Sequence, residues 1–219
     1  YLQAYLGYDI DTPLAAADWL TLPEQKLCSL TAGAVFHDDI GLASLRERLA
    51  YYPRDVWLYL MACGWARIGQ EEHLTGRAGI AGDEIGATLI AARLMRDIMR
   101  LCFLMERTYA PYAKWFGTAF NRLACAGEIT PYLTHVLNAD DWQTRQQRLT
   151  PAYEALARNH NALSITASMP ENVRDFFGRP FKVMAQHGFS DALIAEIENP
   201  DFRKFARSGR IGSVDQFSD

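Results

Sequence analysis

The chain has 219 residues, of which 49% are hydrophobic, 12% aromatic and 22% charged, a composition typical of one large or two small globular domains. Its 22 Lys and Arg against 26 Asp and Glu give a formal net charge of −4, so no chain-wide positive field attracts nucleic acid or anionic lipid. The longest apolar run, residues 56–66, is shorter than the roughly 20 residues that cross a bilayer. We therefore expect no membrane partner.

The pattern of helix-starting prolines and the scarcity of alternating polar and apolar residues predict an all-α fold, a multi-helix bundle. The expected helices cover, in chain order, residues 12–20, 23–30, 43–51, 53–74, 82–107, 114–126, 131–137, 140–163, 170–177, 190–197 and 200–207. One short β-hairpin is expected near residues 34–42, where two apolar segments flank Asp38 and Asp39.

Two of these helices are long, and we expect them to be buried at the centre of the bundle. Residues 56–63 of the first are apolar on every side, which is typical of a core helix. The second carries one polar stripe, which either faces solvent or lines a cleft: Arg93, Arg96, Asp97, Arg100 and Arg107.

The cysteines are expected to be free thiols packed among apolar neighbours. No Cys-x-x-Cys pair occurs, so zinc and redox motifs are absent. Free buried thiols are typical of a reducing compartment, and we expect a cytoplasmic protein. The four positions are Cys28, Cys63, Cys102 and Cys125.

The connection between the two long helices breaks the usual rule of helix electrostatics. Acidic residues are favoured at the start of a helix, yet the helix 53–74 ends in acids. A short loop, 75–82, then leads to two more acids, so an antiparallel return brings the charged groups together. They are Glu71, Glu72, His73, Arg77, Asp83 and Glu84.

Crowded carboxylates call for a positive partner. The candidates are a divalent metal ion, an amine-bearing substrate or basic residues of another domain. A carboxyl group among other acids also has a raised pKa and can act as a general base. We therefore predict catalytic roles for Glu71, Glu72 and Asp83.

The other polar groups of this turn, His73, Arg77 and Glu84, are predicted to contact substrate. The structural alternative remains open. Asp83 and Glu84 are ordinary residues for a helix start, and the preceding acids can face water beside arginines.

A second candidate segment, residues 109–120, places five aromatic residues around an isolated lysine. Lys114 can hold a phosphate group while Tyr112 or Trp115 stacks on a base, and we predict that these three residues bind substrate. Alternatively, the rings belong to the core and Lys114 extends outward.

The sequence resembles a bacterial family known as domain of unknown function 4037. The segments that carry the resemblance are Tyr51–Trp57, Gly69–Leu74, Gly82–Gly86, Tyr109–Gly117, Phe177–Phe181 and Gly212–Gln216. Full-length members of the family look like a nucleotidyltransferase-type α/β half followed by this helical half. The resemblance therefore implies that residues 1–219 are one helical domain, the C-terminal part of a longer two-domain protein.

Nucleotidyltransferases hold magnesium and a nucleotide with a Gly-Ser pair followed by Asp-x-Asp. This chain lacks that centre, since Asp9-Ile10-Asp11 has no Gly-Ser ahead of it. The resemblance thus implies that Mg²⁺ and nucleotide bind the N-terminal nucleotidyltransferase-like domain, the expected partner. This chain alone is expected to be inactive.

The function that follows is a substrate-side domain, which lines the acceptor pocket for nucleotidyl transfer to a small molecule. The alternative is a non-catalytic module for inter-domain or protein–protein contact, in which the acids and the Arg stripe dock a partner. Nucleic-acid binding is disfavoured by the acidic balance, although Arg93, Arg96 and Arg100 would form a small basic patch.

Overall fold

The computed structural model describes residues 2–9 and 12–217. Ile10 and Asp11 of the Asp-x-Asp segment lie outside this range. Helices dominate, and the strands of the described residues form one two-stranded antiparallel hairpin. The predicted all-α class is confirmed.

The elements are α1 (Leu2–Leu6), α2 (Ala16–Thr21), α3 (Glu24–Thr31), α4 (Leu42–Arg48), α5 (Arg54–Glu71), α6 (Leu74–Ile80), α7 (Glu84–Met105), η1 (Ala113–Trp115), α8 (Phe116–Phe120), α9 (Ala126–Leu137), α10 (Trp142–Ala162), β1 (Arg174–Phe176), β2 (Arg179–Val183), η2 (Ala185–His187), α11 (Phe189–Ala195), α12 (Pro200–Ser208) and α13 (Val214–Phe217).

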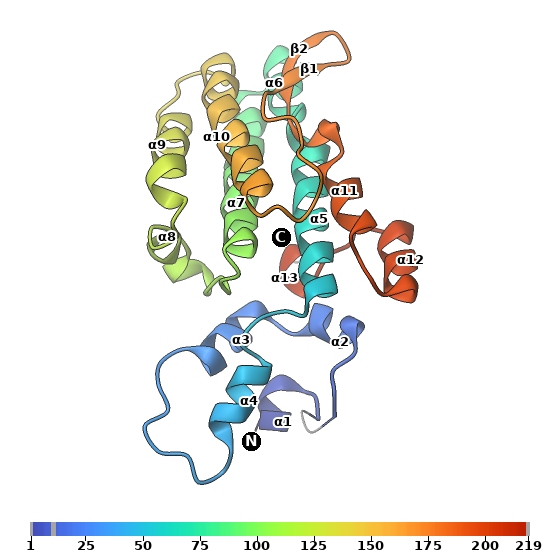
Figure 1. Cartoon of the computed structure of the whole chain (residues 1–219). Helices are drawn as coiled ribbons and strands as arrows, with labels where there is room; N and C mark the ends of the chain where they lie inside the picture. Colours follow the sequence, from blue (N-terminus) through green and yellow to red (C-terminus); the bar gives the residue numbers. More distant parts are fainter. Residues whose placement is uncertain (1, 10–11, 218–219) are drawn as a thin grey trace.

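The helices α5, α7 and α10 form the centre of the bundle (Figure 1). The helix α5 packs against both α7 and α11, and α10 packs against α7 and α9. Leu58, Tyr59 and Met61 of α5 are completely buried, as the all-round apolar pattern requires. The predicted pair of long central helices is confirmed, while α1 to α4 lie at the N-terminal end below the bundle.

The hairpin predicted near residues 34–42 is wrong. Residues 33–41 form an irregular loop, in which the Asp38 carboxylate accepts hydrogen bonds from the backbone N–H groups of Leu42 and Ala43, both at 2.8 Å. The first N–H groups of a helix have no partner within the helix, and Asp38 accepts hydrogen bonds from two of them at the start of α4. Asp38 therefore stabilises a helix terminus rather than the turn of a hairpin.

The hairpin lies instead where a helix was predicted, at 170–177. Asp175 pairs with Lys182 across the two strands. Between the strands, Phe177 and Gly178 have φ angles of 48° and 72°, and two successive positive φ angles are typical of a type I′ hairpin turn. The bulky Phe177 concealed this turn from sequence reasoning, since it rarely adopts a positive φ.

The predicted loop 75–82 contains the helix α6, which contacts α7 and α10. Gly79 allows this close packing, because a Cβ atom there would lie 2.0 Å from Cγ of Trp142. The extra helix separates the end of α5 from the start of α7.

No described helix is long and apolar enough to cross a membrane. All four cysteines are free thiols.

Candidate functional site

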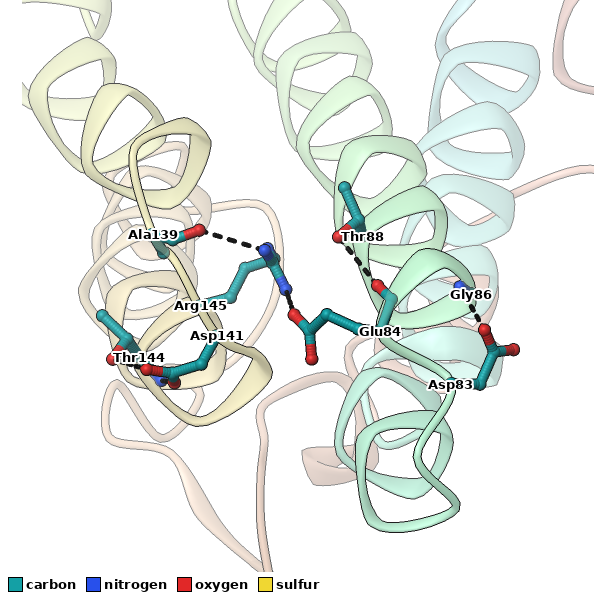
Figure 2. Close-up of polar contacts among 8 residues, drawn as sticks. All are labelled: Asp83, Glu84, Gly86, Thr88, Ala139, Asp141, Thr144 and Arg145. Atoms are coloured by element: carbon teal, nitrogen blue, oxygen red, sulfur yellow. Dashed lines mark hydrogen bonds and ion pairs between the residues drawn. The ribbon is translucent and has the colours of Figure 1, made fainter.

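The acids at the α5–α7 connection have separate partners. Glu71 forms a two-point ion pair with Arg93, with N–O distances of 2.9 and 3.0 Å. Glu84 accepts a hydrogen bond at 2.6 Å from Nη1 of the buried Arg145 on α10 (Figure 2). The same guanidinium donates from Nη2 to the carbonyl of Ala139 at 3.0 Å. Each of these carboxylates is already neutralised by an arginine.

Asp83 caps the start of α7. Its Oδ1 accepts a hydrogen bond from the backbone N–H of Gly86 at 2.7 Å. Figure 2 shows Asp83 and Glu84 on opposite sides of the first turn of α7, with only Glu84 directed toward α10. The expected gathering of four carboxylates is therefore wrong, because α6 and helix geometry direct them to different surroundings.

Glu72 is 1% exposed and joins the end of α5 to the segment after β2. Its Oε2 accepts hydrogen bonds from the backbone N–H groups of Met184, at 2.6 Å, and Ala185, at 3.2 Å. Burial raises the pKa of Glu72 to about 7. The raised pKa expected for one acid of this group is thus present, but its cause is burial rather than neighbouring acids.

His73 stacks on Phe176, with ring centroids 4.2 Å apart and planes inclined by 16°. Burial, followed by the charges of Arg77 and Arg179, lowers the pKa of His73. Arg77 itself is exposed. This imidazole therefore contacts the hairpin rather than the carboxylates of the turn.

The acids at the α5–α7 connection do not form a metal centre by themselves. Within residues 2–9 and 12–217, no three His, Cys, Asp or Glu side chains are grouped so that they could hold a metal ion. The carboxylates around α6 are instead engaged in ion pairs with arginines and in a helix cap.

The aromatic segment divides between core and surface. Trp115 is 53% exposed, and Nζ of Lys114 lies 4.9 Å from the centroid of its ring. Phe116 and Phe120 instead pack against the buried Phe103. The core reading thus holds for Phe116 and Phe120, whereas Lys114 and Trp115 lie at the surface.

A cavity of about 510 Å³ opens between α3, α7, the segment 110–116, the end of α9 and α13. Its polar lining consists of Glu24, Gln25, Arg96, Arg100, Tyr112 and Asp215. Its apolar lining includes Met95, Met99 and Phe116. Such a mixture of an apolar wall with a few polar groups is typical of small-molecule sites.

Glu24 is the most deeply placed acid of this cavity, with a side chain 9% exposed. Its Oε1 accepts a hydrogen bond at 2.9 Å from the backbone N–H of Ala110, and its Oε2 lies 3.7 Å from Nη1 of Arg100. Burial raises the pKa of Glu24 to about 7, against the opposing effects of the Ala110 hydrogen bond and the Arg100 charge. The group can therefore exchange a proton near neutral pH.

Two arginines of the polar stripe on α7 bring positive charge to the cavity that contains Glu24. Arg96 and Arg100 line the cavity, which confirms for these two residues that the stripe faces a cleft. Arg93 is held by Glu71, and the guanidinium of Arg107 lies 4.8 Å from the ring centroid of Trp57. Burial and the charge of Arg100 lower the pKa of Arg96.

Sequence reasoning missed Glu24 and Asp215. An acid directly after Pro23 is ordinary for the first turn of a helix, and neither residue stands near another candidate in the sequence. One signal was available. Asp215 and Tyr112 both lie in segments that carry the family resemblance, and the fold brings these distant segments to one cavity.

Most of the residues that line this cavity lie in a part of the chain that matches a known family. Residues 19–116 match the family described as Domain of unknown function (DUF4037), a range that contains Glu24, Arg96, Arg100 and Tyr112. No curated protein and no solved structure matches the chain. The match covers residues 19–116 and agrees with the family resemblance noted in the sequence.

Proposed function

We propose that this chain is the helical substrate-side domain of a nucleotidyltransferase-like protein of the bacterial cytoplasm. In this proposal the cavity between α3, α7 and η1 receives a small-molecule acceptor. The observation that carries the proposal is Glu24, a carboxyl group with a pKa of about 7 in a cavity of about 510 Å³. Perturbed acids in concave pockets are frequent at functional sites.

Glu24 would act as the general base. Its carboxylate would take the proton of an acceptor hydroxyl or ammonium group. The oxygen or nitrogen could then attack the α-phosphorus atom of a nucleoside triphosphate, whose bond to the bridging oxygen breaks so that pyrophosphate leaves. A base whose pKa is near the working pH combines sufficient basicity with a large ionised fraction. The nucleotide and Mg²⁺ would be held by the N-terminal half, since the acids of this chain do not group for a metal ion among the described residues.

The test uses the protein together with its N-terminal half. Glu24→Gln keeps an acceptor for the Ala110 N–H group but cannot take a proton, and we expect kcat to fall by roughly 10²–10⁴-fold. Glu71→Gln is the matched control, since it removes an acid paired with Arg93 outside the cavity. Full activity of a folded Glu24→Gln protein would refute the role of Glu24.

The second candidate, an inter-domain contact module, is supported by exposed apolar side chains on α7. Ile85 and Leu89 are 77% and 61% exposed and lie one turn apart on the same helix face. Burial of such residues by the N-terminal half would stabilise a two-domain protein. If this face is the contact, Ile85→Glu combined with Leu89→Glu should separate the halves in a co-purification of separately expressed domains.

A further inference from the structure

Two of the four free cysteines meet near the C-terminal end of α7. Cys102 belongs to α7, and Cys125 directly precedes the first residue of α9. Both line a cavity of about 500 Å³, separate from the one that contains Glu24, and their thiols are joined by a side-chain hydrogen bond. The fold thus brings together two sulfur atoms that lie far apart in the sequence.

Glu106 fixes the position of this pair. Its backbone N–H group donates to the carbonyl of Cys102 at 3.0 Å, so Glu106 lies one turn further along the same helix. Its side chain accepts hydrogen bonds from the backbone N–H groups of Ala124 and Cys125, both at 2.8 Å. Because Glu106 is bonded to the backbone on both sides of the pair, the backbone of the fold holds the two cysteines close to each other.

The two thiols differ in their exposure to small molecules. Cys102 is 1% exposed, and its hydrogen bond with Cys125, followed by burial, raises its pKa well above the ordinary value. Cys102 therefore stays protonated and does not react readily by itself. Cys125 is only partly buried and borders the cavity, so a small oxidant reaches the sulfur of Cys125 first.

We propose that Cys102 and Cys125 form a redox site, in which hydrogen peroxide converts the two thiols into a disulfide bridge between α7 and the start of α9. The sulfur of Cys125 attacks one oxygen atom of the peroxide, the O–O bond breaks and water leaves, so that Cys125 becomes a sulfenic acid. The sulfur of Cys102 then displaces the hydroxyl group, which leaves with the thiol proton as a second water molecule. The two electrons lost by the thiols reduce the peroxide, and a dithiol reductant restores both thiols.

The bridge would close a covalent loop that carries one wall of the Glu24 cavity. The loop includes residues 110–116, which contribute to that cavity, and Ala110 within it donates to Glu24. A cross-link restricts the unfolded chain, so the oxidised protein should resist unfolding better than the reduced protein. The redox site does not depend on the proposed function, because its chemistry needs only the two thiols and the peroxide.

Treatment of the reduced protein with hydrogen peroxide, followed by alkylation and peptide mass spectrometry, tests the inference. We expect the peptides that contain Cys102 and Cys125 to be joined, with the loss of two hydrogen atoms, and dithiothreitol should separate them again. Cys28 is the internal control, since it is also partly exposed, and it should enter no cross-linked peptide. The melting temperature of the oxidised protein should rise and return to its first value on reduction.

Variants separate the bridge from general oxidation. Cys102→Ala should leave Cys125 as a sulfenic acid, which dimedone labels, and should abolish the rise in melting temperature. Cys28→Ser should still form the bridge. If Cys102→Ala does not fold, Cys125→Ser changes the less buried partner and should likewise abolish the bridge. Absence of the joined peptides in the unaltered protein, or cross-linking of Cys28 in equal yield, overturns the inference. The proposed function is judged separately, by the turnover of Glu24→Gln.

Discussion

The Asp215 carboxylate accepts a hydrogen bond from the backbone N–H of Glu24 at 2.6 Å, although 191 positions separate the two residues. This contact joins α13 to the first turn of α3. It also places a second negative charge beside Glu24, and that charge contributes to the raised pKa of Glu24. The helix α13 thus helps to set the pKa of the acid in the cavity.

Asp215→Asn should lower the pKa of Glu24. The substitution removes a negative charge that disfavours ionisation of Glu24, while the amide oxygen can still accept from the Glu24 N–H group. Arg100→Gln should have the opposite effect, because the Arg100 charge lowers this pKa. A carboxyl ¹³C NMR titration of each variant measures both shifts, and shifts in the same direction would contradict this account of the cavity.

Glu72 should make the stability of the fold depend on pH. Its pKa in the folded chain, about 7, exceeds the ordinary value of 4.5, so the folded state favours the protonated form. Ionising Glu72 in the folded chain therefore costs free energy. This loss of stability is absent below about pH 4.5, grows as the pH rises and is complete above about pH 7. We expect Glu72 ionisation to cost about 1–3 kcal/mol of unfolding free energy over this interval.

Urea unfolding at several pH values measures this effect. Glu72→Gln should reduce the loss of stability between pH 5 and pH 8, since glutamine carries no charge and still offers an oxygen to the Met184 N–H group. Glu71→Gln removes the adjacent acid, whose partner is Arg93, and serves as the control. An unchanged pH slope in Glu72→Gln would show that Glu72 does not govern it.

Local sequence patterns predicted the positions of the helices well, but they did not predict the contacts between distant segments. The apolar run 56–63 and the prolines that begin helices identified α5, and the Arg stripe identified the face of α7 that reaches the cavity. The hairpin was misplaced because Asp38, which suits a turn, caps α4 instead. Phe177, a bulky residue with a positive φ, gave no turn signal.

The candidate site depended on contacts that a linear sequence does not display. The acids of the α5–α7 connection are close in sequence, yet Glu71 pairs with Arg93 and Glu84 with Arg145. Glu24 looked like a common helix-start acid, and only the fold covers it with Ala110 and Asp215. Burial, which raises its pKa, is a property of tertiary structure.

Gly79→Ala should destabilise the fold although alanine favours helices. The new Cβ would lie 2.0 Å from Cγ of Trp142, so α6 and α10 must move apart, at a cost of about 1–3 kcal/mol. Gly127→Ala in α9 is the matched control, since no heavy atom lies within 4 Å of its added Cβ. It should be neutral or stabilising by up to about 1 kcal/mol. Thermal unfolding compares the two, and equal melting temperatures would contradict the close packing at α6.

Arg145 should contribute more to stability than its partner Glu84. The Arg145 side chain is 8% exposed and also donates to the Ala139 carbonyl, whereas Glu84 is 45% exposed and can be solvated when it loses the guanidinium. We expect Arg145→Met to cost about 1–3 kcal/mol, because the Ala139 carbonyl loses a charged donor, and Glu84→Gln to cost below about 1 kcal/mol.

A double-mutant cycle by urea unfolding separates these contributions. The coupling energy between Arg145 and Glu84 should be about 1 kcal/mol or less, since one partner is half exposed. The remainder of the Arg145→Met loss then belongs to the contact with Ala139 and to the burial of the arginine stem. Equal losses in both single variants, with a coupling energy that accounts for all of each, would instead assign the whole effect to the ion pair. In that case the hydrogen bond from Arg145 to Ala139, in the connection between α9 and α10, would contribute nothing to stability.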